Sequence, residues 1–207
     1  MTQRFTRWTG WLAAGLACSA WSTQAATVQV DVVDDAGRPV AGAVVFLESP
    51  AARALVKPLP QAEVAQEKKQ FLPGVLVVPV GTQVHFPNRD SVRHHVYSFS
   101  PAKKFELKLY SGTPSTPVLF DKSGVVTLGC NIHDQMVRWV LVVDTPYYPR
   151  TPAATGKAQL DNVPPGTYTL RTWHARLPVG APTLEQALTV PATGSATASV
   201  RMTGLQP

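Results

Sequence analysis

Three side chains that can bind a soft metal ion lie within one seven-residue segment. The segment reads Cys130-Asn-Ile-His133-Asp-Gln-Met136, so a thiol, an imidazole and a thioether follow one another at intervals of three residues. Sulfur ligands combined with imidazole suit copper, and two histidines and one cysteine with a weak axial methionine form the blue-copper arrangement. A site of that kind needs one more imidazole from elsewhere in the chain.

The adjacent pair His94-His95 can supply this imidazole. The pair stands at the start of an alternating apolar segment, Val96 to Phe99, which predicts a β-strand. Because neighbouring residues of a strand point to opposite faces, only one of the two histidines can point at a metal. The pattern alone leaves open which one does.

Two other chemistries are open to Cys130 and His133. Zinc binds both residue types, but structural zinc sites usually carry more cysteines and rarely recruit a thioether. The second is covalent catalysis, with Cys130 as the nucleophile and His133 as its base. The methionine beside them fits metal ligation better. The serines near the histidines, Ser98 and Ser100, form no Gly-x-Ser-x-Gly turn, which argues against a serine hydrolase.

The segments around these side chains read as short β-strands. The hydrophobic content of 44% is enough for a core, and the charged content of 15% is too low for a disordered chain. The 14 glycines and 19 prolines favour strands joined by turns. Strand-length apolar runs recur at spacings of about 8–12 residues, as in a β-sandwich. We expect an all-β fold with no helix longer than two turns, and a first central strand over residues 61–71.

The N-terminus reads as an export signal. Arg4 and Arg7 are positive, Trp8 to Ala20 is mostly apolar and uncharged, and small residues fit cleavage after Ala25. The apolar run is too short to span a bilayer comfortably, and no later run approaches the ~18 apolar residues of a membrane span. We expect a periplasmic protein without a membrane span; a buried N-terminal helix is the alternative. A lipid anchor at Cys18 is disfavoured because a glycine stands where a bulky aliphatic residue is needed.

Signal cleavage would change the charge and the cysteine count. The formal net charge would fall from +6 to +4, because Arg4 and Arg7 are lost without any acid. Loss of Cys18 would leave Cys130 as an unpaired thiol in an oxidising compartment, to be explained as intermolecular, reactive or metal-bound. The basic residues are scattered singles and pairs without interleaved aromatic residues, so nucleic acid is not an expected partner.

The metal-binding pattern resembles that of the type I copper proteins, the cupredoxins. The resemblance runs through Gly81-Thr-Gln-Val84-His-Phe86-Pro-Asn88, the six-residue step from Asn88 to His94, and the Cys-x-x-His-x-x-Met segment that begins at Cys130. It covers residues 61–145. The short loop between the cysteine and the methionine is similar to that of amicyanin, and the chain is similar to proteins labelled methylamine utilization proteins. The resemblance implies a Greek-key β-sandwich that binds one type I copper ion.

The resemblance also implies roles for single residues. Asn88 would support the site through an amide that ties the His94 loop to the Cys130 loop. His95 stands where these proteins commonly carry asparagine, and is therefore the less favoured of the two adjacent histidines. The implied metal ligands are His94, Cys130, His133 and Met136.

The flanking segments resemble a second family, the carboxypeptidase regulatory-like (transthyretin-like) sandwiches. Residues 30–45, with Gly37-Arg-Pro39 and Gly42-Ala43, look like the opening half of such a sandwich, and residues 155–170, with Pro164-Pro-Gly166, look like the closing half. We therefore expect a second small β-sandwich built from the flanks. The expected division is a signal over 1–25, flanking β-segments over 27–55 and 150–205, and a copper domain over 61–145.

The expected function is electron transfer rather than catalysis. The resemblance implies redox partner proteins, such as a quinoprotein dehydrogenase as donor and a c-type cytochrome as acceptor. A copper carrier or sensor is one alternative, and a cell-envelope module that binds carbohydrate or protein is another.

Overall fold

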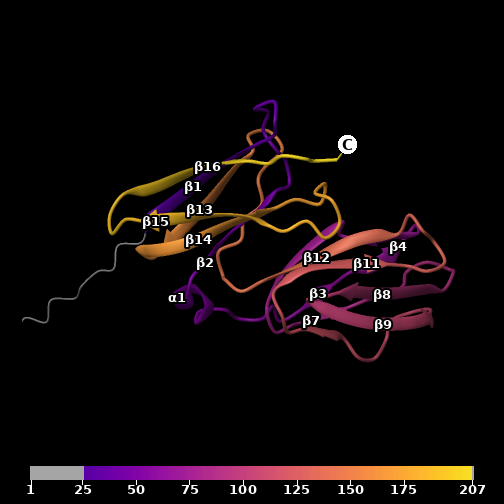
Figure 1. Ribbon diagram of the computed structural model, residues 1–207. Helices are drawn as coiled ribbons and strands as arrows, with labels where there is room; N and C mark the ends of the chain where they lie inside the picture. The colour runs from indigo at the N-terminus through magenta and orange to yellow at the C-terminus, as the bar shows by residue number, and fades with distance from the viewer. Residues whose placement is uncertain (1–25, 207) are drawn as a thin grey trace, which may run out of the picture.

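The computed structural model describes residues 26–206 and is almost entirely β-structure (Figure 1). This confirms the expected all-β fold class. The helix α1 (Pro50–Arg53) is a single turn, capped by Ser49, whose Oγ accepts a hydrogen bond from the backbone N–H of Ala52. No helix within residues 26–206 is long and apolar enough to cross a membrane. The expected export signal, with Cys18, lies outside the described residues.

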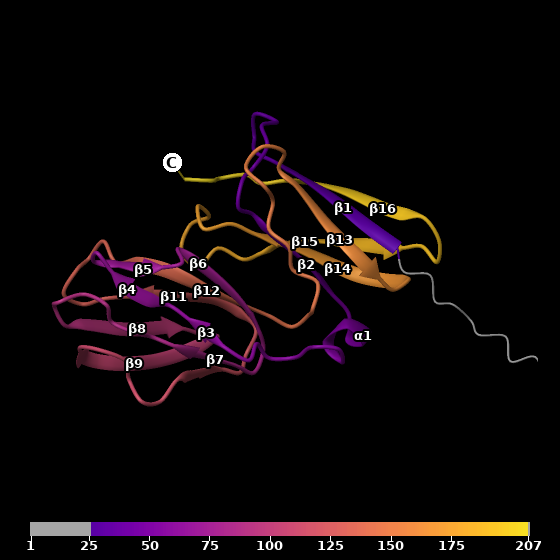
Figure 2. The same cartoon turned by 180° about the vertical axis from the view of Figure 1, so that it is seen from behind.

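One β-sandwich is built from the two ends of the described chain, and we call it the flanking sandwich (Figures 1 and 2). Its two sheets have the strand orders β13-β1-β16 and β15-β14-β2. The first pairs β1 with β16 in parallel and with β13 in antiparallel fashion. The strands are β1 (Ala26–Val33), β2 (Val44–Glu48), β13 (Lys157–Val163), β14 (Gly166–Trp173), β15 (Leu184–Val190) and β16 (Ser195–Arg201).

The strands between β2 and β13 form the second sandwich, called the central sandwich here. A five-stranded sheet of order β6-β12-β11-β8-β9 faces a three-stranded sheet of order β10-β7-β3, and β4 and β5 form a separate hairpin. The strands are β3 (Ala62–Glu63), β4 (Ala65–Glu67), β5 (Gln70–Leu72), β6 (Val75–Pro79), β7 (Thr82–His85), β8 (His94–Ser100), β9 (Lys103–Tyr110), β10 (Val118–Phe120), β11 (Gly124–Gly129) and β12 (Val137–Val143).

The strand β12 contributes side chains to both hydrophobic cores. Val140 and Val142 are buried in the core of the central sandwich, whereas Leu141 and Val143 are buried in the core of the flanking sandwich. This division follows from the two-residue period of a strand, because successive side chains point to opposite faces. The five-stranded sheet is therefore covered on its outer face, over β12 and its neighbour β6, by the flanking sandwich.

The expectation of a single strand over residues 61–71 was wrong. The structure has three short strands there, and the chain reverses between β4 and β5 at Lys68 and Lys69. Both lysines adopt positive φ angles, 53° and 57°, which form the tight turn. Apolar alternation did not indicate this turn because lysines rather than glycine or asparagine occupy it.

Candidate metal centre

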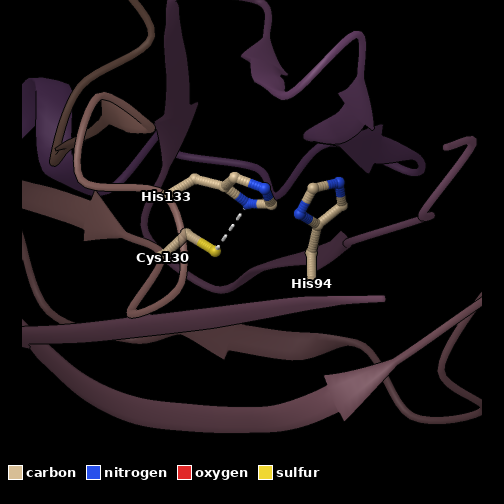
Figure 3. Close-up of side chains that lie close together, drawn as sticks. All are labelled: His94, Cys130 and His133. Atoms are coloured by element: carbon tan, nitrogen blue, oxygen red, sulfur yellow. Dashed lines mark hydrogen bonds between the residues drawn. The ribbon is translucent and has the colours of Figure 1, made fainter. Parts of the chain in front are cut away.

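Three potential metal ligands meet at one end of the central sandwich (Figure 3). One ligand atom each from His94, Cys130 and His133 lies within 4.8 Å of the other two. The Sγ atom of Cys130 is 3.9 Å from Nδ1 of His133, and the ring centroids of the two histidines are 5.0 Å apart. His94 therefore lies beside Cys130 and His133, the two candidate ligands of the short loop.

The strand pairing brings these residues together. Gly129 is the last residue of β11 and pairs with both Tyr97 of β8 and Val137 of β12, so Cys130 leaves the sheet between these two strands. A Cβ atom on Gly129 would lie 2.7 Å from the Tyr97 ring, so only glycine allows this close approach. The loop then turns back with a hydrogen bond from the Met136 N–H to the His133 carbonyl oxygen, 2.9 Å long.

The candidate ligands differ in exposure. His94 is fully buried, and Cys130 and Met136 are 3% and 1% exposed. Met136 belongs to the same hydrophobic cluster as Cys130. His133 is half-buried and is thus the ligand nearest to solvent. The arrangement is a buried cluster with a single imidazole at its surface.

The orientation of His94 leaves one ring nitrogen free for a metal. Its Nε2 is 2.7 Å from Oδ2 of Asp90, whereas its Nδ1 is buried and has no hydrogen-bond partner among the described residues. A carboxylate partner keeps the proton on Nε2, so Nδ1 presents its lone pair, as a metal-bound histidine requires. The unpartnered nitrogen fits a metal ligand.

Asp90 is itself held by the turn between β4 and β5. Its carboxylate accepts hydrogen bonds from the backbone N–H groups of Lys68, at 2.7 Å, and Lys69, at 2.9 Å. Burial alone would raise the pKa of Asp90, but the hydrogen bonds from Lys69, His94 and Lys68 outweigh it and lower the pKa. Asp90 therefore stays ionised and can hold the His94 proton at neutral pH. The sequence did not indicate this role, because its only local sign is an acidic residue four positions before His94.

The neighbouring His95 points to the opposite face of β8. Its Nε2 lies 3.0 Å from Oε1 of Glu106, close enough for an ion pair but not aligned as a hydrogen bond. Its ring packs edge-on against Tyr97, with the centroids 5.8 Å apart. The structure thus places His94, and not His95, beside Cys130.

The expected hydrogen bonds of Asn88 differ from those observed. We expected its amide to tie the His94 loop to the Cys130 loop. Instead its Nδ2 donates to the carbonyl oxygens of Val92, at 2.8 Å, and Tyr110, at 2.9 Å, and its Oδ1 accepts from the Asp90 N–H. Asn88 also pairs with Gly112 through its backbone, which directs its side chain toward the end of β9. It supports the turn that carries Asp90.

Tyr110 closes the site from the end of β9. Its hydroxyl donates to the Phe86 carbonyl oxygen at 2.7 Å. Burial raises the pKa of Tyr110; a hydrogen bond with Gln66 opposes this shift, and the nearby Cys130 adds to it. The phenol therefore stays neutral.

The donor set favours copper over the alternatives. One cysteine, two imidazoles and a nearby buried thioether match the blue-copper ligand types. Cys130 is the free cysteine of the described residues, so the multiple cysteines usual in structural zinc sites are lacking there.

Comparison with known proteins gives similarity to copper proteins over part of the chain. No model of a known protein family matches the sequence, and no curated protein matches it. A purple cupredoxin from Nitrosopumilus maritimus is 25% identical with a TM-score of 0.36, and the match covers 40% of this chain and 100% of that one. A Cu(I) amicyanin variant is 23% identical with a TM-score of 0.37, and the match covers 48% of this chain and 98% of that one.

A copper-containing nitrite reductase from Thermus scotoductus is 23% identical with a TM-score of 0.38, and the match covers 54% of this chain and 28% of that one. TM-scores below 0.5 do not by themselves establish a common fold. The case for copper therefore rests on the side chains of this chain.

Proposed function

We propose that this chain is an exported type I copper protein that carries single electrons between redox partners. The observation that carries the proposal is the buried, unpartnered Nδ1 of His94, which lies in one cluster with the Cys130 thiol and the His133 imidazole. Residues 61–145 would form the copper domain, and Met136 would be the weak fourth ligand.

The residues around the site explain how it would work. Copper bound there would supply a one-electron couple between Cu(II) and Cu(I). Asp90 and the turn at Lys68 and Lys69 hold His94 in one orientation, and Cys130 is fixed at the end of a strand. Ligands that are held before the metal changes charge need little rearrangement. The half-buried His133 would be the route by which electrons enter and leave.

The partners and the location belong to the same proposal. The resemblance of the Cys-x-x-His-x-x-Met loop to that of amicyanin suggests a quinoprotein dehydrogenase as donor and a c-type cytochrome as acceptor. The N-terminal export signal suggests a periplasmic location. The net positive charge would attract an acidic partner, so electron transfer should slow as ionic strength rises.

The proposal is tested by adding Cu(II) to the metal-free protein. One equivalent should produce an intense blue thiolate-to-copper absorption band. The Cys130→Ser variant should stay colourless, because the band arises from the thiolate, while Ser98→Ala, on the same sandwich but outside the ligand cluster, should keep the band. A colourless wild-type protein, or colour that survives Cys130→Ser, would show the proposal to be wrong.

A further inference from the structure

We propose that a pocket on the outer face of the five-stranded sheet binds a small, flat aromatic molecule that carries a hydroxyl group. The pocket has a volume of about 400 Å³ and lies between β8, β11, β12 and the loop that follows β14. None of its lining residues is a candidate metal ligand, although Gly129 and Val137 adjoin Cys130 and Met136 in the sequence. The proposal does not rest on bound copper or on the proposed electron transfer.

Both sandwiches contribute to the pocket. The outward-facing side chains Tyr97 and Thr127 form its floor with Gly129, and Val179 from the flanking sandwich forms one wall. On the rim, Phe99 is 77% exposed and Val179 is 72% exposed. Both side chains line the same hollow, and exposed apolar side chains gathered around a hollow are typical of a binding site.

The size and lining suit a small ligand. Ligand pockets have volumes of about 300–1,000 Å³ and are mostly apolar with a few polar groups that orient the ligand. Here the polar groups are hydroxyls. Tyr97 and Thr127 make no side-chain hydrogen bonds among the described residues, and Ser100 uses its Oγ as an acceptor for the Thr127 N–H, which leaves its proton available. A ligand hydroxyl could pair with any of these three groups.

A row of aromatic rings favours a flat, aromatic ligand. Along β8 the rings of His95, Tyr97 and Phe99 follow one another, with centroid distances of 5.8 Å and 5.2 Å. Rings at these distances are in the range of favourable aromatic contact, and a further ring can join the row by stacking or by an edge-on contact. Phe99 at the open end leaves most of its ring uncovered.

The apolar surface ends at the next strand, which argues for a small occupant rather than a protein. The residues of β9 that pair with Phe99 and Tyr97 are Lys104 and Glu106, and both are exposed. Beside Phe99 and Tyr97 the surface of β9 is therefore charged rather than apolar. A macromolecular interface needs a total buried area above about 1,000 Å², with an apolar centre of matching breadth.

The test uses 2-naphthol as the probe and calorimetric titration of the full chain, first without copper. We expect one site with a dissociation constant of about 10–100 µM, in keeping with the affinities of small ligands. Naphthalene, which lacks the hydroxyl, and 2-decalol, which lacks the aromatic rings, should each bind about fivefold more weakly.

Two variants locate the site, and one serves as a control. Thr127→Trp should fill the floor, and Val179→Glu should place a charge on the exposed wall; each should weaken 2-naphthol binding more than tenfold. Leu55→Ala, which removes an exposed leucine (52%) away from the pocket, should leave binding unchanged. Val179→Glu is in a loop, so it tests the site even if Thr127→Trp impairs folding.

Three outcomes would overturn the proposal. The first is no binding of 2-naphthol to wild-type protein that binds copper normally. The second is equal binding to Val179→Glu. The third is self-association that Phe99→Ala abolishes in protein that does not bind the probe, which would assign the surface to a second copy of the chain. Loss of the blue band with intact 2-naphthol binding would refute only the proposed function.

Discussion

At the residue scale, the free nitrogen of His94 links folding to metal binding. A buried polar group without a hydrogen-bond partner costs about 1–3 kcal/mol, and Nδ1 of His94 is such a group. A metal on Nδ1 would remove this cost. A ligand that binds only the folded protein also stabilises it in proportion to the logarithm of its concentration over its dissociation constant. The metal-free protein should therefore unfold more easily than the copper form.

The two adjacent histidines give the sharpest comparison of ligands. In the His94→Ala variant the blue band should be abolished, because His133, the other imidazole of the cluster, already serves as a ligand in the proposed site. The His95→Ala variant should keep the band, because His95 faces Glu106 on the other side of the sheet. Absorption spectra after addition of Cu(II) decide the matter. A band that survives His94→Ala but disappears in His95→Ala would reverse the assignment.

The carboxylate of Asp90 should tune the affinity for copper. Replacing a carboxylate that orients a metal-bound histidine typically lowers metal affinity by about 10–100-fold, and we expect this for Asp90→Asn. The matched control is Asp121→Asn, which removes an exposed carboxylate paired with Lys103. Competition with a chelator of known affinity measures the change. Equal copper affinities for the two variants would contradict the role of Asp90.

The sequence indicated the candidate ligands but not the residues that hold them in place. Cys130, His133 and Met136 lie in one loop, so their proximity follows from their spacing alone. The role of Asp90 depends on a hydrogen bond between side chains and on a turn more than 20 residues earlier in the chain. Such contacts are properties of the folded chain and leave no local pattern. For Asn88 the converse holds: its motif was recognised, but its hydrogen-bond partners were predicted wrongly.

At the element scale, the hairpin of β4 and β5 holds a strained turn. A residue other than glycine with positive φ costs about 1–2 kcal/mol, and both Lys68 and Lys69 adopt this conformation. The strain is offset because their N–H groups bind Asp90. The lysine pair explains why residues 61–71 were expected to form one strand, since alternation without a glycine or asparagine gives no sign of a turn.

Relieving this strain should stabilise the protein. Lys69→Gly keeps the backbone N–H that binds Asp90, and it should raise the free energy of unfolding by about 0.5–1 kcal/mol after the entropy cost of glycine. Lys69→Ala should not, because alanine is strained at positive φ as well. Chemical denaturation compares the two variants. A gain with alanine equal to that with glycine would show that backbone strain is not the cause.

The segment after β14 should make stability depend on pH. His174 donates from Nε2 to the Ala41 carbonyl oxygen at 2.9 Å and accepts the Arg176 N–H at Nδ1, 3.1 Å away. Burial lowers the pKa of His174 below 6.5; the hydrogen bond to Ala41 opposes this shift, and the charge of Arg176 adds to it. The folded state therefore binds fewer protons than the unfolded state as pH falls through about 6.5, and stability decreases.

Removing this histidine tests the effect. The free energy of unfolding should fall with decreasing pH more steeply for the wild type than for His174→Gln, by at most about 1.4 kcal/mol per pH unit, and the two should run parallel above about pH 7. Denaturation between pH 5 and 8 gives both profiles. Parallel profiles over the whole range would exclude His174 as the titrating group.

At the scale of the whole molecule, β12 joins the two sandwiches into one packed unit. Leu141 is 1% exposed and belongs to the flanking core, although its neighbours Val140 and Val142 belong to the central core. Trp139 of β12 also meets Trp173 of β14, with ring centroids 6.2 Å apart. The continuous apolar run from Trp139 to Val143 indicated a strand, and such a run is what a strand buried on both faces gives. Its second partner could not be read from the sequence.

This shared strand should make the two sandwiches unfold together. Calorimetry should show a single transition. Leu141→Ala should lower the free energy of unfolding by about 2–5 kcal/mol, and the variant should still unfold in one transition. The control Leu55→Ala, at a half-exposed site, should cost less than about 0.5 kcal/mol. Two separate transitions, or a loss confined to one of them, would show that the sandwiches are independent.

The central claim, reversible one-electron carriage by a retained copper ion, is tested most directly by one redox cycle of the copper-loaded protein. The protein is reduced, passed through a desalting column, reoxidised and analysed for absorption and metal content. We predict that one electron per copper bleaches the band, that reoxidation restores it, and that the copper content is unchanged, because His94 and Cys130 are buried and held in place. Loss of copper in the reduced form would indicate a metal carrier, and it would contradict this account.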